Sequence, residues 1–253
     1  MKYLKLYESI KDKNEIYTWL ENFYNTAYFR NGDKTSSRMS SNTYMNNFTI
    51  NDDYSITSNN DIVITNYIKS LKGEALPYKF RFVMGNFKCN GLGLTSLKNT
   101  PEIVVDNFDC SYNNLTSLEG GPRRTHNYMC SNNNLKNLKG IGRFHFLDCS
   151  NNNITHLNDI DSDIIENVEI KGNPIDDLYS YLKTFKSIGL VTSYSILERK
   201  KLIFRSLKEF NVINGNTIVL DSLKEALSNI DEDFEKLFDI KKLLEIKGYE
   251  ILR

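Results

Sequence analysis

Residues 108–118 read Phe-Asp-Cys-Ser-Tyr-Asn-Asn-Leu-Thr-Ser-Leu, and this stretch decides the fold because its pattern returns along the chain. Four of the units carry Cys at the third position, and four carry Asn at the sixth. A fixed period in this range is the sequence signature of a solenoid built from repeats. The five units are 19 to 21 residues apart and begin at Phe87, Phe108, Tyr128, Leu147 and Val168.

The repeat predicts a short strand and a turn in every unit. Phe108 and Cys110 lie on one side of an extended chain and face the core, whereas Asp109 points to the other side. The pattern Leu-x-Leu-x-x-Asn-x-Leu-x-x-Leu resembles the leucine-rich repeat, at the short end of its length range. Only about seven to nine residues link one unit to the next strand, too few for a full helix, so the convex side is expected to be extended or 3₁₀.

We therefore expect an α+β fold: a leucine-rich repeat solenoid with short parallel strands, an N-terminal helix and hairpin cap, and a C-terminal helical module. Three domains follow. Residues 1–47 form an N-terminal helical region and flexible loop, residues 48–178 form the solenoid with a degenerate N-terminal repeat, and residues 179–253 form a C-terminal helical module with a β-hairpin.

Local patterns predict the elements of the two ends. On the N-terminal side they are a helix at 14–28, a loop at 31–42, a hairpin at 48–56 and a degenerate repeat at 62–71. On the C-terminal side they are helices at 178–188, 193–209 and 232–246, a helix that begins at a Ser222–Glu225 capping box, and a hairpin at 212–219 with a type I′ turn at Asn214-Gly215.

Asparagine holds a fixed place in the repeats. The chain contains 32 Asn and no Gln. An amide at a bend bonds backbone groups that neither helix nor sheet satisfies, so the recurring Asn residues are expected to stack into a ladder along the coils. These residues are Asn113, Asn133, Asn152 and Asn173.

The four cysteines also mark a repeat position. They lie about twenty residues apart without a CxxC pair, which argues against a disulfide or zinc framework. Buried thiols in an apolar column are expected, with a redox or metal role as the alternative. They are Cys89, Cys110, Cys130 and Cys149.

Composition and motifs exclude several classes of function. The net charge is zero, which argues against a nucleic-acid partner, and no apolar run is long enough for a membrane span. The charged first ten residues do not resemble a secretory signal. Nucleophile, zinc-protease and phosphate-loop motifs do not occur, and every cysteine is a repeat position, which excludes the bacterial ubiquitin ligases that couple a catalytic Cys to such repeats. We expect no enzyme and no cofactor.

One column of residues has metal-binding chemistry. Asp106, His126, His145 and Glu166 each lie four residues before a core position, so the repeat stacks them on successive coils. Two histidines between two carboxylates could hold a divalent metal such as zinc, or serve a metal-dependent enzyme. A solvated polar rim is the favoured interpretation.

The concave face is the preferred candidate for function. Repeat proteins bind extended protein surfaces with such faces, and aromatic and Met residues ringed by polar groups are typical hot spots. A merely solvated face is the alternative. The outward residues are Lys88, Asp109, Met129, Asp148 and Glu169; they are flanked by Asn107, Asn127, Phe146 and Asn167 on one side and by Ser111, Ser131, Ser150 and Lys171 on the other, and Tyr112 adds an apolar anchor.

The runs 48–53, 107–122 and 212–221 resemble a largely uncharacterised family of leucine-rich repeat proteins of tailed bacteriophages, over about residues 48–225. The resemblance implies a phage-encoded protein in the host bacterial cytoplasm that binds a host or phage protein, for example a defence or CRISPR effector. Residues 1–9, with Leu6-Tyr7-Glu8, also resemble phage leader peptides that are cleaved in the prohead. This second resemblance implies a virion-associated or internal phage protein as the alternative.

Overall fold

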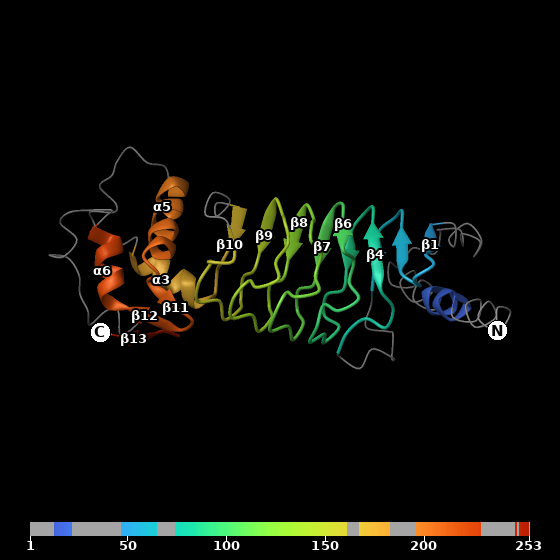
Figure 1. The fold of residues 1–253 in the computed structure, drawn as a ribbon, viewed down its shortest axis with the longest axis horizontal. Helices are drawn as coiled ribbons and strands as arrows, with labels where there is room; N and C mark the ends of the chain where they lie inside the picture. Colours follow the sequence, from blue (N-terminus) through green and yellow to red (C-terminus); the bar gives the residue numbers. More distant parts are fainter. Residues whose placement is uncertain are drawn as a thin grey trace, which may run out of the picture. The chain divides into compact units, whose positions relative to one another are not determined.

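The repeats coil into a parallel β-solenoid of about five turns, accompanied by a few helices, in a computed structural model of the chain (Figure 1). The structure describes residues 13–21, 47–64, 74–160, 167–182, 196–228, 246 and 248–252, with the backbone alone for 196–199. Two compact units divide the chain and are described separately. The first comprises residues 1–130 and 140–145, and the second comprises residues 131–139 and 146–253.

Short parallel strands of the first unit form what we call the repeat sheet. They are β3 (Ile62–Val63), β5 (Phe87–Lys88), β7 (Asn107–Asp109) and β8 (Asn127–Met129). Phe87 pairs with Phe108, and Phe108 with Tyr128, so the repeat positions stand in register on neighbouring strands. The predicted short parallel strands are confirmed, and Ile62–Val63 shows that the strand of the degenerate repeat forms as well.

A second set of strands in this unit forms what we call the back sheet. The predicted hairpin is confirmed as β1 (Phe48–Ile50) antiparallel to β2 (Ile56–Ser58). Parallel strands β4 (Phe80–Val83) and β6 (Ile103–Val104) continue from β2, as the arrows in Figure 1 show. Single bridges extend the ladder through Arg124 and Arg143. The expected extended conformation is confirmed, although the pattern did not predict that these segments pair.

Aromatic rings and thiols fill the core of the first unit. The rings of Phe80, Phe87, Phe108 and Tyr128 follow one another with centroid separations of 5.1, 5.9 and 5.0 Å. Burial of such side chains contributes about 1.5–3 kcal/mol each. All four cysteines of the chain are buried thiols, as predicted. Cys89 and Cys110, which directly follow β5 and β7, are fully buried.

The predicted asparagine ladder is confirmed in both units. In the first, the amide group of Asn113 donates to the carbonyls of Cys89 and Cys110, and its oxygen accepts from the backbone N–H groups of Leu92 and Leu94. In the second unit, Asn152 and Asn173 make the same kind of bonds, with Oδ1 accepting from Leu135 N and Ile154 N. Each buried amide therefore joins the backbone of two successive coils.

The second unit contains two repeat strands and the C-terminal module. Strands β9 (Phe146–Asp148) and β10 (Val168–Glu169) are parallel. Helices α3 (Pro174–Leu182), α5 (Ile196–Glu209) and α6 (Leu220–Ser228) follow, with β11 (Ile213–Asn214) antiparallel to β12 (Thr217–Val219). Strand β13 (Glu250–Leu252) pairs parallel with β12 and was not predicted.

Two details of this module correct the sequence analysis. Helix α6 begins at Leu220, directly after β12, so Ser222 lies inside the helix and the predicted capping box is wrong. The hairpin turns at Gly215 and Asn216, because Asn214 pairs with Thr217. Only the first of these two turn residues has a positive φ, 60° at Gly215, which fits a type II′ turn instead of the predicted type I′.

Side chains of the C-terminal module bond the last coils of the same unit. Lys200 Nζ donates to the carbonyl of Val168 at 2.8 Å, and Lys208 Nζ donates to that of Ile160 at 3.0 Å. The Tyr249 hydroxyl donates to the carbonyl of Thr155. These donors bond backbone carbonyls of the last two repeats, so the C-terminal module caps this end of the solenoid.

Several predicted segments lie wholly or partly outside the described residues. The helix at 14–28 is confirmed over 13–21. No helix in the described part of the chain is long and apolar enough to cross a membrane. Outside it are the leader, the loop at 31–42, the end of the degenerate repeat, residues 183–195, most of the helix at 232–246, and Glu166.

Candidate functional site

The predicted outward column exists on the repeat sheet. In the first unit, Lys88 pairs with Asp109 and Asp109 with Met129, so the three side chains project from one register position. Lys88 is exposed, and the other two are half-buried. In the second unit, Asp148 pairs with Glu169 at the equivalent position.

The acidic members of this column bond the turn that follows each strand. Asp109 Oδ1 accepts from the backbone N–H of Ser111 at 3.0 Å. In the second unit, Asp148 accepts from Ser150, and Glu169 accepts from the N–H of Lys171. These carboxylates therefore stabilise the coil, whatever else they contact.

The serines are not a border of this face. Ser111 and Ser131 are buried, because the chain turns inward after each strand, and Ser150 is half-buried. The prediction that they flank the binding surface on one side is therefore wrong for Ser111 and Ser131. Lys171 is exposed, as expected of a flanking residue.

The flanking asparagines of the first unit form a second ladder on the surface. Asn127 Nδ2 donates to Asn107 Oδ1 at 2.7 Å, and Asn107 Nδ2 donates to Asn86 Oδ1 at 2.6 Å. Asn86 in turn donates to Asp61 Oδ1 at 3.0 Å. Asn107 and Asn127, predicted as binding residues, thus also link successive coils, and the sequence analysis missed Asn86 and Asp61. The sequence did contain a signal for Asn86, because this residue directly precedes Phe87 just as Asn107 directly precedes Phe108.

Two aromatic side chains stand out by their exposure. Phe146, which begins β9 in the second unit, is 42% exposed, and Asn167 of that unit is half-buried. Tyr112, in the turn after β7 of the first unit, is 65% exposed.

Tyr112 also has an unusual backbone. Its φ is 56°, in the left-handed region, and the same turn position has positive φ in each of the five repeats. Left-handed backbone costs an L-residue about 1–2 kcal/mol, least for Gly and Asn. The other four coils carry those two residues, namely Gly91, Asn132, Asn151 and Gly172. Tyr112 is therefore the exception at this position of the repeat, because the other four residues there are of the two types that best tolerate a left-handed backbone.

Asp106, His126 and His145 form the predicted column in the first unit. The N–H of His126 donates to the carbonyl of Asp106, and that of His145 to the carbonyl of His126, both at 2.8 Å. The two imidazole rings lie 5.2 Å apart and are exposed. Glu166 lies outside the described residues. Among the residues that are described, no three His, Cys, Asp or Glu side chains are placed to hold a metal ion.

The buried thiols lack nucleophilic character. Burial raises the pKa of Cys89 and Cys149 far above the ordinary thiol value, and it does the same for Cys110. A thiol is nucleophilic as the thiolate, and reactive cysteines sit where their pKa is lowered. These three residues therefore serve as small apolar side chains of the core.

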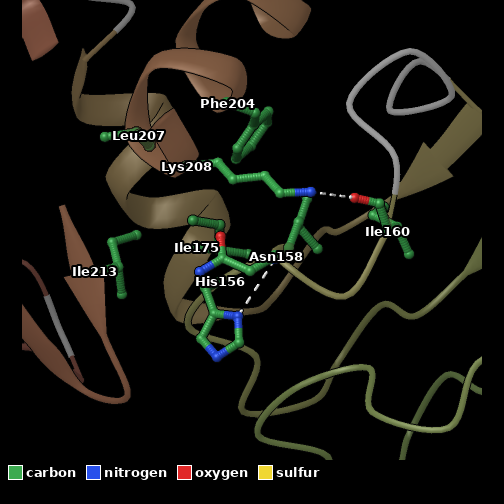
Figure 2. Close-up of a pocket in the computed structure, with 9 residues that line it drawn as sticks. His156, Asn158, Ile160, Ile175, Phe204, Leu207, Lys208 and Ile213 are labelled. Atoms are coloured by element: carbon green, nitrogen blue, oxygen red, sulfur yellow. Dashed lines mark hydrogen bonds between the residues drawn. The ribbon is translucent and has the colours of Figure 1, made fainter. Parts of the chain in front are cut away.

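A small hollow in the second unit lies between the end of the fourth repeat, helix α3 and helix α5 (Figure 2). Phe204, Leu207 and Ile213 line it together with His156 and Lys208. Figure 2 shows the amino group of Lys208 directed at the Ile160 carbonyl, whereas the His156 ring points away from Phe204. The volume of the hollow is about 10 Å³, close to the minimum for one water molecule. The hollow is a packing defect rather than a ligand site.

No protein-family model, curated protein or solved structure matches the chain, so its repeats and the geometry above are the grounds on which its function is argued.

Proposed function

We propose that the chain is a non-enzymatic protein-binding module of the leucine-rich repeat type. The binding surface is the outer side of the repeat sheet, centred in the first unit on Tyr112, Met129 and Lys88. The twenty-residue period, the in-register parallel strands and the buried Asn at each bend support the assignment to this repeat class. Extended protein partners are the usual ligands of such surfaces.

The observation that carries this proposal is the strain at Tyr112. A residue that is largely exposed recovers little of its backbone cost through packing, and Asn or Gly would remove most of that cost. Strain of this kind is typically kept where a side chain has a function. A large aromatic ring that buries on association is the commonest kind of hot spot in protein interfaces.

The kind of partner follows from the phage resemblance alone. That resemblance supports a host bacterial protein, such as a defence or CRISPR effector, encountered in the host cytoplasm. The chemistry of the face adds that the partner offers an apolar pocket for the Tyr112 ring and polar groups for its border, since Lys88 and Asp109 are paired on the neighbouring strands β5 and β7.

The test uses Tyr112→Asn with Tyr54→Asn as its matched control. Tyr54 also has a left-handed backbone, with φ of 60°, but it lies in the β1–β2 turn away from the repeat sheet. Both variants relieve the same strain and remove the same side chain. Affinity purification from host lysate with the three proteins in parallel, quantified by mass spectrometry, identifies partners that depend on the face.

We expect a partner that is retained by the wild type and by Tyr54→Asn and weakened about ten-fold or more by Tyr112→Asn, which corresponds to about 1.4 kcal/mol. The dissociation constant of the purified pair then confirms the ranking. A partner bound equally by all three proteins would show that Tyr112 is not part of the interface.

A further inference from the structure

Two arginines occupy one column of the back sheet in the first unit. Ile103 pairs with Arg124, and Arg124 pairs with Arg143, in successive parallel bridges. Both arginine side chains are exposed. Neighbouring strands lie about 4.8 Å apart, and like charges at paired positions destabilise a sheet. The column therefore places two arginines on neighbouring coils, where repulsion between their charges is a cost to the free protein.

Two histidines lie beside these arginines on the same coils. His126 and His145 each follow an arginine by two residues, and the buried Thr125 between Arg124 and His126 points the other way. The imidazole rings are 5.2 Å apart. The four side chains thus form two rows on adjacent coils, and we call this set the Arg–His grid: Arg124, His126, Arg143 and His145.

The acids around the grid form no ion pair with its arginines. Glu102 is already shared between Lys79 Nζ at 2.9 Å and Arg123 at 3.3 Å, and the hydrogen bond from Lys79 is the main cause that lowers the pKa of Glu102. Asp106 lies one coil before His126. No carboxylate of the described residues is within ion-pair distance of Arg124 or Arg143.

Exposed apolar side chains continue the same edge on the preceding coils. Val105, next to Asp106, is 46% exposed, and Met84, next to Gly85, is 52% exposed. The N–H of Val105 bonds the carbonyl of Val83, which places the two turns on neighbouring coils. A ligand of this edge therefore meets aliphatic surface on one side and cationic groups on the other.

We propose that the Arg–His grid, with Val105 and Met84, docks an acidic protein segment that also carries aliphatic side chains. Guanidinium groups bind carboxylates in bidentate geometry, and a carboxylate between the two arginines relieves their repulsion. A nucleic acid fits less well, because the whole chain has no net charge to attract a polyanion and the edge offers it aliphatic side chains. This surface is on another sheet than Tyr112 and does not depend on the function proposed above.

The histidines themselves report on occupancy. The chain has three His, and the third, His156, lies in the second unit as an internal control. Imidazole NMR signals of the full chain are followed during titration, at low salt, with a short peptide of Asp and Leu. Parallel titrations use the same peptide with Lys in place of Asp and an oligothymidylate of equal net charge. The variants are Arg124→Gln/Arg143→Gln, the charge-keeping Arg124→Lys/Arg143→Lys, and Lys98→Gln/Lys136→Gln, which removes the same charge elsewhere.

We expect the acidic peptide to shift the signals of His126 and His145 saturably and to leave His156 in place. The glutamine pair at the grid should weaken this binding about five-fold or more. The lysine pair should weaken it less, because lysine keeps the charge and loses only the bidentate geometry, whereas Lys98→Gln/Lys136→Gln should stay near the wild type. Absence of a saturable shift, equal weakening by Lys98→Gln/Lys136→Gln, or tighter binding of the oligothymidylate would each overturn the proposal.

Discussion

Replacing Asn113 with Ala should destabilise the first unit by about 4 kcal/mol. The amide makes four short bonds of 2.9–3.0 Å with Leu92, Leu94, Cys89 and Cys110, and a longer one of 3.3 Å to the carbonyl of Ser111. Alanine would remove the four short bonds, which leaves two backbone N–H groups and two carbonyls without this close partner inside the coil. Each buried polar group left unsatisfied costs about 1–3 kcal/mol. We take the lower value for each of the four groups, because a water molecule that enters the vacated space would bond some of them.

The adjacent Asn114 provides the matched control. It is exposed, and its amide makes one long bond of 3.4 Å to the carbonyl of Gly93. Asn114→Ala should therefore cost less than about 0.5 kcal/mol. Comparison of the two alanine variants separates the loss of the buried ladder from any general effect of removing asparagine in this turn.

Urea unfolding followed by the fluorescence of the single tryptophan is the assay. Trp19 packs against Tyr78 and Phe80 of the first unit, with ring centroids 5.4 and 6.3 Å apart, so its emission reports on that unit. With a typical urea slope of about 2 kcal/mol per molar, a loss of 4 kcal/mol lowers the midpoint by about 2 M. If Asn113→Ala moved the midpoint no further than Asn114→Ala, the ladder would contribute little and the reasoning from its hydrogen bonds would be refuted.

Three further changes test the core and the turn by the same assay. Tyr112→Asn should raise the free energy of unfolding by up to about 1 kcal/mol, because Asn tolerates the left-handed backbone; a loss of stability would contradict the strain. Tyr128→Phe should also stabilise, by about 1 kcal/mol, since the Tyr128 hydroxyl is buried without a hydrogen-bond partner among the described residues; a decrease would reveal a partner. Burial raises the pKa of Cys89, Cys110 and Cys149, so these thiols stay protonated in the folded chain, whereas unfolded thiols ionise near 9.0. The free energy of unfolding should therefore be unchanged below that pH and fall above it. A urea midpoint that does not change between about pH 8 and 10.5 would contradict the burial of these thiols as the cause.

The twenty-residue period predicted those parts of the fold that recur at fixed spacing. Residues twenty apart become neighbours in a solenoid, so Phe108, Cys110 and Asn113 could be assigned to core and ladder by alignment with their counterparts. Short-range turn chemistry likewise identified the hairpins at β1–β2 and β11–β12. In the repeats, the residues that interact occupy the same position of successive units. In the hairpins, they lie a few residues apart on either side of a turn.

The back sheet was not predictable in this way. The turn between the back sheet and the repeat sheet contains Val105 and Asp106 in one coil but His126 alone in the next, so the units have unequal lengths there and lose their register in an alignment. Strand β13 pairs with β12 from a distant part of the chain that has no repeat. Pairing of such segments depends on tertiary packing that no local pattern records.

The structure also narrows the candidate binding face by assigning several of its polar residues to the scaffold. Asn107 and Asn127 bond one another across coils, and Asp109 bonds the turn after its strand. A partner that used these groups would have to compete with bonds that hold the coils together. In the first unit, Tyr112 and Lys88 are exposed, and their side chains make no such bond to another described residue. The proposed recognition by the repeat sheet therefore rests on few side chains, which is the usual distribution of binding energy in an interface and makes a single substitution at Tyr112 a decisive test.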